Sequence, residues 1–185
     1  MSPRRATLAA VLLSALNLAG CRSEHPPIAL AADVDLERFM GDWYVIANIP
    51  TRLEREAYGA VESYRLAPDG TIETTFTFSK GGFDGERKQY NPRGFVRPGT
   101  GNAVWGMQFV WPVKADYRIA WLAPDYSTVV IGREARDYVW IMAREPSIPD
   151  AEYERLLGFV AQQGYDVAKV RKVPQRRAVA GNEAR

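Results

Sequence analysis

The feature that most constrains the fold is a two-residue alternation of apolar and polar side chains, which recurs along the middle of the chain. Successive side chains of a β-strand point to opposite faces, so residues two apart share a face. Turn signals such as Pro68-Asp69-Gly70 separate the alternating segments, and short strands divided by turns about every 8–12 residues predict an antiparallel β-sandwich or β-barrel. Four rows are clearest: Ile72, Thr74, Phe76 and Phe78; Ala103, Trp105, Met107, Phe109 and Trp111; Tyr117, Ile119 and Trp121; and Tyr138, Trp140 and Met142.

One helix is predicted near the end of the chain. Ser147 stands three residues before Asp150, as in a capping box, and Pro149 suits the first turn. Gly164 supplies a stop, and a last strand over residues 166–172 follows. The helix has one apolar stripe, which predicts that it packs outside the sheet on one side only. The stripe consists of Tyr153, Leu156, Leu157 and Val160.

The aromatic residues mark the limits of the packed domain. All five Trp, nine Tyr and seven Phe lie between Phe39 and Tyr165. We therefore expect a single packed domain between these two residues, with a different kind of segment at each end.

Composition excludes several kinds of site. The chain has one Cys and one His, so it cannot form an internal disulfide framework, a Cys/His zinc site or a two-His metal site. A Ser-His-acid triad would have to use His25, which precedes every aromatic residue. No metal or cofactor is expected.

The first 20 residues have the pattern of a secretory signal peptide. Arg4 and Arg5 are followed by an uncharged run, residues 6–16, that is too short to span a bilayer. Residues 1–20 hold two of the 24 basic residues and none of the 22 acidic ones, so the rest of the chain is balanced. The slightly basic composition therefore carries no indication of nucleic-acid binding.

Residues 18–21, Leu-Ala-Gly-Cys, resemble the lipobox of bacterial lipoproteins. This resemblance implies that Cys21 becomes the first mature residue and carries diacylglycerol and an amide-linked acyl chain. Several acyl chains anchor a protein firmly without a membrane span. Arg22, in place of Asp, implies sorting to the outer membrane, and residues 21–32 then form an extended tether.

Three further motifs resemble those of the lipocalin family, and most closely its bacterial outer-membrane lipoproteins. Residues 41–44, Gly-Asp-Trp-Tyr, match the opening of the first lipocalin strand; Asp125-Tyr126 is similar to the second signature, and Arg144 to the third. The resemblance covers residues 33–173, which are expected to form the barrel domain, and residues 174–185 are expected to form a flexible tail. It implies an all-β fold: an eight-stranded antiparallel up-and-down barrel with one C-terminal α-helix outside and a short ninth strand.

Gly41, Trp43 and Arg144 are interpreted as fold-defining. An indole can close the base of a barrel against water, and a guanidinium laid across it gains a cation–π contact of about 0.5–2 kcal/mol. The same guanidinium can donate hydrogen bonds to carbonyl groups of the closing turn.

Side chains an even number of residues from Trp43 and Arg144 on the same strands, and the matching rows of the other strands, are predicted to face the barrel interior and line a ligand cavity. Small residues among the aromatic rings, Ala47, Thr74 and Gly132, are expected to leave it partly open. The candidate ligand-binding residues are Val45, Ala47, Tyr64, Thr74, Phe76, Phe78, Met107, Phe109, Ile119, Trp121, Tyr138, Trp140 and Met142.

An apolar lining with a few hydroxyl groups suits an acyl chain such as palmitate. Burial of fifteen methylenes at about 0.8 kcal/mol each gives a gross binding free energy of roughly 12 kcal/mol. Drug-sized ligands usually gain only about 0.3 kcal/mol per non-hydrogen atom, so the net value for a fatty acid is about 5–6 kcal/mol. This corresponds to micromolar or weaker binding. Tyr64, Tyr138, Arg52 and Arg55 are candidates for the head group. Glu62 would repel an anion if it faced the cavity, so we expect it to be solvated near the mouth.

The leading hypothesis is a membrane-anchored binding protein, a monomer or homodimer, that stores or transports a fatty acid or lysophospholipid. It is not expected to be an enzyme. Two alternatives stay open: a barrel enzyme that acts on a bound lipid, for which the interior offers only Tyr, Thr, Met and Glu62, and a tetrapyrrole carrier, which would need Tyr or Met as an axial ligand.

Overall fold

A computed structural model describes residues 25–176 of the chain. The signal peptide and Cys21 lie outside the described residues. No helix in the described part of the chain is long and apolar enough to cross a membrane.

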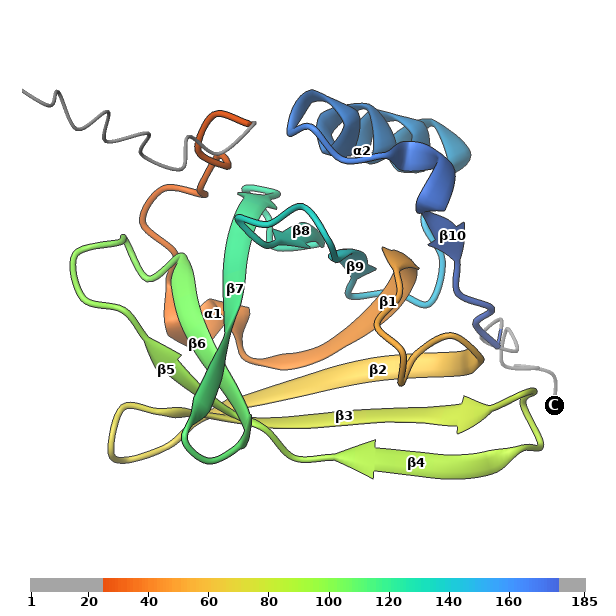
Figure 1. Ribbon diagram of the computed structural model, residues 1–185, viewed down its shortest axis with the longest axis horizontal. Coiled ribbons are helices and arrows are strands. Elements are labelled where there is room, and N and C mark those ends of the chain that lie inside the picture. Colours follow the sequence, from red (N-terminus) through yellow and green to blue (C-terminus); the bar gives the residue numbers. More distant parts are fainter. Residues whose placement is uncertain (1–24, 177–185) are drawn as a thin grey trace, which may run out of the picture.

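The strands form a closed antiparallel barrel (Figure 1). Apart from β4 and β10, strands that follow one another along the chain pair with each other, and β1 closes the sheet by pairing with β9. This confirms the predicted eight-stranded barrel. The strands are β1 (Gly41–Ile49), β2 (Ala57–Leu66), β3 (Ile72–Lys80), β4 (Glu86–Tyr90), β5 (Arg93–Val96), β6 (Val104–Val110), β7 (Val113–Leu122), β8 (Thr128–Gly132), β9 (Val139–Ala143) and β10 (Arg171–Lys172).

Ten strands make eight positions in the barrel because β4 and β5 share one and β10 lies outside the ring. Both β4 and β5 pair with β3, and Pro92, which has no backbone N–H, lies between them. The predicted last strand is shorter than expected. A single 3₁₀ turn, η1 (Val167–Lys169), precedes β10, which pairs with Ala47 and Asn48 of β1.

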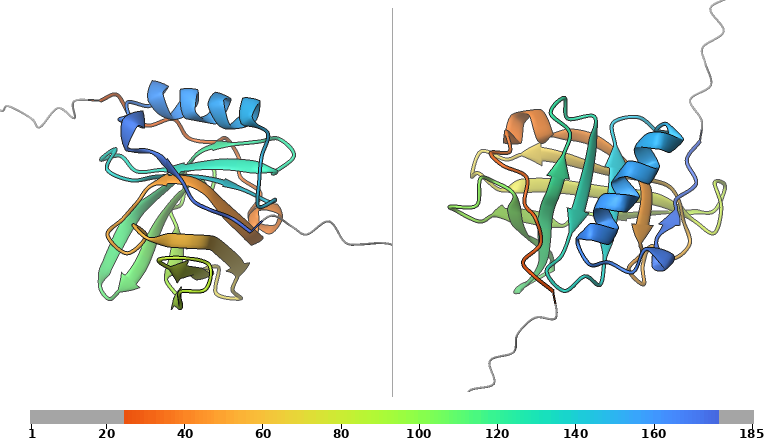
Figure 2. Two further views of the ribbon diagram at one scale, coloured as in Figure 1. Left: turned by 90° about the vertical axis from the view of Figure 1, so that its right-hand side faces the viewer. Right: turned by 90° about the horizontal axis from the view of Figure 1, so that it is seen from above.

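The described residues form two α-helices, a short one that leads into the first barrel strand and a long one outside the barrel. The short helix α1 (Leu36–Phe39) is capped at its N-terminus by Asp35, whose carboxylate accepts a hydrogen bond from Arg38 N. The helix leads directly into β1. The long helix α2 (Asp150–Gln162) lies across the outside of the barrel (Figure 2). The prediction of a Ser147 cap was wrong, because Pro149 takes the cap position and no side chain caps the helix. Gly164 ends it as predicted, with a positive φ of 87°.

The apolar residues form two layers separated by the sheet. The inner cluster fills the barrel and includes Trp43, Trp105 and Phe78. The outer cluster joins the exterior of β1, β8 and β9 to Leu156 and Val160 of α2. The helix therefore contributes to stability from outside and leaves the barrel interior to the strands.

The segment before the barrel packs against it. Ile28 is buried in the outer cluster, and Ala31 N donates to Ile119 O at 2.9 Å. Arg136 Nη2 donates to Pro26 O at 2.6 Å. At the other end, Gln175 Nε2 donates to Val45 O at 2.8 Å. Residues on both sides of the predicted domain, Pro26 to Ala31 and Gln175, therefore pack against the barrel.

Candidate functional site

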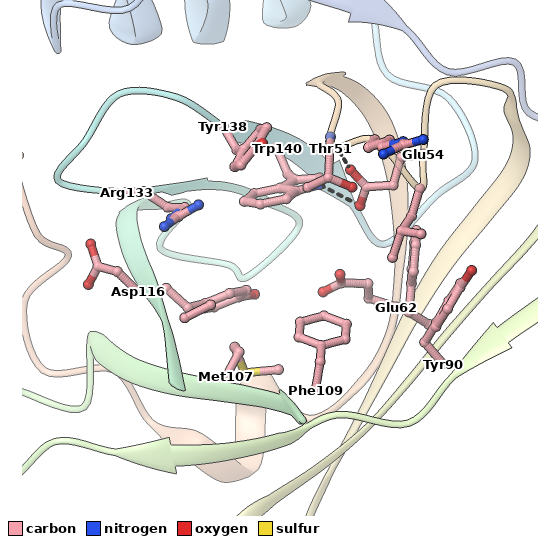
Figure 3. A pocket seen from close by; sticks show the side chains of 15 residues that line it. Thr51, Glu54, Glu62, Tyr90, Met107, Phe109, Asp116, Arg133, Tyr138 and Trp140 are labelled. Atoms are coloured by element: carbon pink, nitrogen blue, oxygen red, sulfur yellow. Dashed lines mark hydrogen bonds between the residues drawn. The ribbon is translucent and has the colours of Figure 1, made fainter. Parts of the chain in front are cut away.

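The barrel encloses a cavity of about 340 Å³, which is within the range of small-molecule sites (Figure 3). It lies between the loop of residues 50–56, the loop of residues 133–138, and the strands β2, β3, β4, β6, β7 and β9. The lining residues are Thr51, Arg52, Leu53, Glu54, Glu62, Phe76, Tyr90, Met107, Phe109, Ala115, Asp116, Tyr117, Arg133, Tyr138 and Trp140.

Two apolar lining residues also reach the surface, which locates the mouth. Leu53 is 52% exposed and Phe109 is 54% exposed. The residues between β6 and β7 continue this apolar rim, since Trp111 is 82% exposed. A ligand can therefore enter between the β1–β2 loop and the end of β6.

Glu62 points into the cavity from β2 (Figure 3). The expectation that it is solvated near the mouth was wrong, because its strand position opposite Trp43 and Phe76 sets it in the apolar wall. Burial, with a smaller effect from the charge of Glu54, raises the pKa of Glu62 from 4.5 to about 8. The carboxyl group is therefore mostly protonated at pH 7.

Glu62 ends a chain of three hydrogen-bonding groups, which we call the inner polar cluster: Glu62, Tyr64 and Tyr117. The Tyr64 hydroxyl donates to Glu62 Oε2. The Tyr64 and Tyr117 oxygens lie 2.6 Å apart, and because the Tyr64 proton is used, Tyr117 is the donor to Tyr64. Burial, with a smaller effect from the charge of Glu62, raises the pKa of Tyr117 well above its ordinary value.

A second buried carboxylate, Glu54, holds the β1–β2 loop against the cavity. Its Oε2 accepts from Thr51 N at 2.9 Å, and its Oε1 accepts from Trp140 Nε1 at 3.1 Å. Burial raises the pKa of Glu54, and these hydrogen bonds and the charge of Arg171 oppose the rise. Glu54 thus positions the Trp140 ring at the cavity wall.

Both cations of the lining belong to the loops at the mouth. Arg52 lies in the β1–β2 loop and Arg133 in the β8–β9 loop. Arg133 Nη1 lies 3.0 Å from Asp137 Oδ2, while its Nε has no hydrogen-bond partner among the described residues. Positive charge therefore borders the entrance, and Glu62 lies deeper in the lining.

The opposite end of the barrel is closed by Trp43. Its ring packs 5.1 Å from that of Phe39, and its Nε1 donates to Phe39 O at 2.9 Å. The guanidinium of Arg144 lies 3.9 Å from the Trp43 ring centre and donates to the carbonyls of Asp42, Arg38 and Phe39. The predicted cation–π contact is present, and none of these groups lines the cavity.

Gly41 and Tyr126 support the same closure. Gly41 has a φ of 94°, and a Cβ there would lie 3.3 Å from Arg144 Nη1. The Tyr126 hydroxyl accepts from Asp35 N at 2.9 Å, and its ring carries the guanidinium of Arg38 at 4.0 Å. The three sequence motifs therefore meet at the base of the barrel.

Comparisons with known proteins identify the family. The family model described as "Lipocalin-like domain" matches residues 34–175. The chain is a lipocalin. It is 30% identical over 165 residues to temperature-induced lipocalin-1 of Arabidopsis thaliana, with 83% of this chain and 86% of the relative covered. It is 28% identical over 174 residues to the outer membrane lipoprotein Blc of Escherichia coli K12, with 88% and 92% covered.

Solved structures show the same fold. Insecticyanin from the tobacco hornworm Manduca sexta matches this lipocalin with a TM-score of 0.63 at 16% identity, covering 80% of this chain and 85% of that one. Crustacyanin and cockroach-allergen structures match similarly.

The structure brings five of the predicted ligand-binding residues to the cavity: Phe76, Met107, Phe109, Tyr138 and Trp140. Six others lie inside the barrel without lining the cavity: Val45, Tyr64, Thr74, Phe78, Ile119 and Met142. Their side chains pack between the cavity and the base or against neighbouring strands. Alternation alone identifies the inner face of the barrel but not the depth at which each residue lies.

Two predicted lining residues lie outside the barrel. Ala47 belongs to the outer cluster, and Trp121 packs beneath Arg155 of α2, whose guanidinium is 4.3 Å from the Trp121 ring centre. The register shifts between Val45 and Ala47 and between Ile119 and Trp121, so each strand changes its inward parity at that point. The prediction that both face the interior was therefore wrong.

A third correction concerns Gly132. Its open side is filled from outside by Ile28 Cδ1 and the Tyr165 hydroxyl, so it leaves no space in the cavity.

Sequence reasoning missed several lining residues because they lie in loops. Thr51, Glu54 and Arg133 have no strand parity, and their contribution depends on how the loops fold over the mouth. Arg52 was predicted as a head-group candidate and does line the cavity. Arg55 instead borders an adjoining hollow with Lys80 and Lys88, which shares Arg52, Leu53 and Tyr90 with the cavity.

Proposed function

We propose that this lipocalin is anchored to the outer membrane through lipidated Cys21 and holds a single-chain amphiphile, a fatty acid or a lysophospholipid, for storage or transport. The observation that carries the proposal is the apolar cavity with its cations at the mouth. Transport or storage requires binding and no chemical step.

The distribution of charge sets the orientation of an anionic amphiphile. Its acyl chain would lie along Phe76, Met107 and Trp140, where each buried methylene contributes about 0.8 kcal/mol. Its carboxylate or phosphate would stay between Arg52 and Arg133, away from Glu62. This arrangement keeps the ionised head group hydrated and the hydrocarbon buried.

The membrane anchor rests on the sequence before residue 25 and on the relatives. The lipobox at residues 18–21 is followed by a segment that joins the packed barrel within a few residues. Relatives from Escherichia coli, Citrobacter freundii and Vibrio cholerae are named outer membrane lipoproteins. An anchor of this kind would keep the cavity close to a source of lipids.

Filling the cavity tests the binding site. Ala115 lines the cavity on β7, so Ala115→Phe should weaken palmitate binding at least about tenfold by occupying ligand volume. The measurement is a titration followed by Trp fluorescence, because Trp140 lines the site. Ala151→Phe, at an exposed position of α2, is the matched control and should bind like the wild type. Equal affinity for all three proteins would place the ligand elsewhere.

Replacing the lipidated residue tests the anchor. Cys21→Ser should leave an unmodified N-terminus and release the protein from the membrane fraction, because a serine oxygen cannot form the thioether. Intact-protein mass spectrometry and membrane fractionation are the measurements. Retention of an acylated, membrane-bound Cys21→Ser protein would contradict the anchor while leaving ligand binding untouched.

A further inference from the structure

The inner polar cluster lies between the cavity and the base of the barrel. Tyr64 packs its ring against those of Phe39 and Trp105, with centres 5.6 and 5.7 Å away, while Glu62 and Tyr117 line the cavity. An acyl chain that enters from the mouth therefore directs its far end toward Glu62 and Tyr117.

One oxygen of the cluster faces the cavity. Tyr64 donates to Glu62 Oε2, and Tyr117 donates to Tyr64. Glu62 Oε1 receives no hydrogen bond from any described residue. A methyl group placed against this oxygen would leave a polar group without a partner in an apolar wall, which is unfavourable.

We propose that the Glu62–Tyr64–Tyr117 cluster is a subsite for a hydroxyl group carried on the buried end of the ligand's hydrocarbon chain. This inference rests on the proposed function and names the ligand class more narrowly: amphiphiles with a second, uncharged polar group far from the head group.

A hydroxyl group fits because it both donates and accepts. When Glu62 is protonated, its O–H can donate to the ligand oxygen, and the ligand proton can go to the Tyr117 oxygen. When Glu62 is ionised, the ligand hydroxyl can donate to the carboxylate. The raised pKa of Glu62 makes the first arrangement the main one at neutral pH.

A carboxylate does not fit the subsite. It has no proton to donate, and the groups that face Glu62 are the hydroxyls of Tyr64 and Tyr117 and the carboxylate of Glu54. Of the other titratable lining residues, Arg52 and Arg133 lie on the mouth loops, Asp116 is paired with Arg118 at 2.9 Å, and Tyr90 and Tyr138 are phenols. No cation in the described lining is placed to neutralise an anion beside Glu62.

Matched ligands test the subsite. Saturated fatty acids of several chain lengths are compared with the ω-hydroxy and ω-amino acids of the same length by calorimetric titration of the purified protein. We expect that at one or more lengths the hydroxy acid binds about five- to tenfold more tightly than the plain acid, as for one good hydrogen bond.

Variants show whether the tighter binding of the hydroxy acid comes from the inner polar cluster. Glu62→Leu should abolish the preference, so that it binds the hydroxy acid and the plain acid of one length equally, and Glu62→Gln should retain part of the preference because the amide still donates and accepts. Tyr90→Phe, which removes a lining hydroxyl from β4 outside the cluster, is the matched control and should keep the full preference. Thermal unfolding checks that each variant folds.

The outcomes are distinguishable. If the wild type binds plain acids but shows no gain for hydroxy acids at any length, or if Glu62→Leu keeps the gain, the subsite is disproved and the proposed function stands. If an ω-amino acid binds more tightly than the hydroxy acid, the subsite takes an ammonium group and the hydroxyl assignment is overturned. If no acid binds at all, the proposed function itself fails.

Discussion

Glu62 is a carboxyl group set in a wall of aromatic rings, and its raised pKa predicts how stability depends on pH. The folded state holds this proton up to about pH 8, whereas the unfolded chain releases it near 4.5. Between these values the unfolded state binds fewer protons, so the free energy of unfolding falls as pH rises, by at most about 1.4 kcal/mol per pH unit.

Glu62→Gln should remove this slope and make the protein more stable than the wild type at pH 8 and above. The measurement is urea denaturation from pH 5 to pH 9. Glu56→Gln, at an exposed position, controls for the loss of one negative charge. A wild-type slope that survives in Glu62→Gln would mean that another group is responsible.

Arg144 combines a cation–π contact with three hydrogen bonds to carbonyl groups, and only a planar guanidinium can make all of them. Arg144→Lys should lower the free energy of unfolding by about 1–3 kcal/mol. Arg155→Lys changes a guanidinium over another indole, Trp121, at a solvent-exposed site and should cost about 0.5 kcal/mol or less. The free energy of unfolding is measured by chemical denaturation. Equal decreases in the two variants would show that Arg144 at the base stabilises the protein no more than an exposed arginine does.

Residues at the base were predictable from the sequence, whereas several residues of the loops at the mouth were not. Trp43 and Arg144 sit in motifs with fixed spacing, and the contact between them follows from the chemistry of an indole and a guanidinium. Glu62 was assigned the correct parity but the wrong environment, since a pattern of alternation gives the face of a strand and not its solvation. Glu54 and Arg133 lie in loops, where no period applies.

Among the elements, strand irregularities explain the errors in the predicted lining. A bulge shifts all later side chains of a strand to the other face. The shifts after Val45 and Ile119 moved Ala47 and Trp121 outside, and a third, between Met107 and Val110, accompanies the exposed end of β6. No residue type in these strands marks such a shift, so it could not be predicted from alternation.

Ile28 of the N-terminal segment and Tyr165, which follows α2, both pack against Gly132 of β8. A Cβ on Gly132 would lie 2.5 Å from Ile28 Cδ1 and 2.7 Å from the Tyr165 hydroxyl oxygen. Gly132→Ala should therefore destabilise the protein by about 1–3 kcal/mol, as overpacking does. Addition of Ile28→Val, which removes Cδ1, should recover part of the loss in thermal or chemical unfolding.

Gly158 provides the control for that experiment. It lies in α2, where a Cβ would meet no neighbouring atom within 4 Å, so Gly158→Ala should stabilise the protein by up to about 1 kcal/mol through helix propensity. A Gly132→Ala protein as stable as the wild type would show that the packing of residue 28 on β8 is loose.

For the whole molecule, the barrel followed from the sequence because two independent signals agreed. Regular alternation with turns predicted an antiparallel barrel or sandwich, and the motifs at residues 41–44, 125–126 and 144 selected the lipocalin barrel. The helix position followed from its single apolar stripe. The size of the cavity and its inner polar cluster depend on how side chains from several strands combine, which no single segment specifies.

The central claim is that this barrel carries a single-chain amphiphile. The most direct measurement is mass spectrometry of the lipids extracted from the protein after purification from its native envelope. We expect a fatty acid or lysophospholipid in stoichiometric amount, enriched in chains with a hydroxyl group. An extract without bound lipid, together with unchanged Trp fluorescence on addition of palmitate, would contradict it.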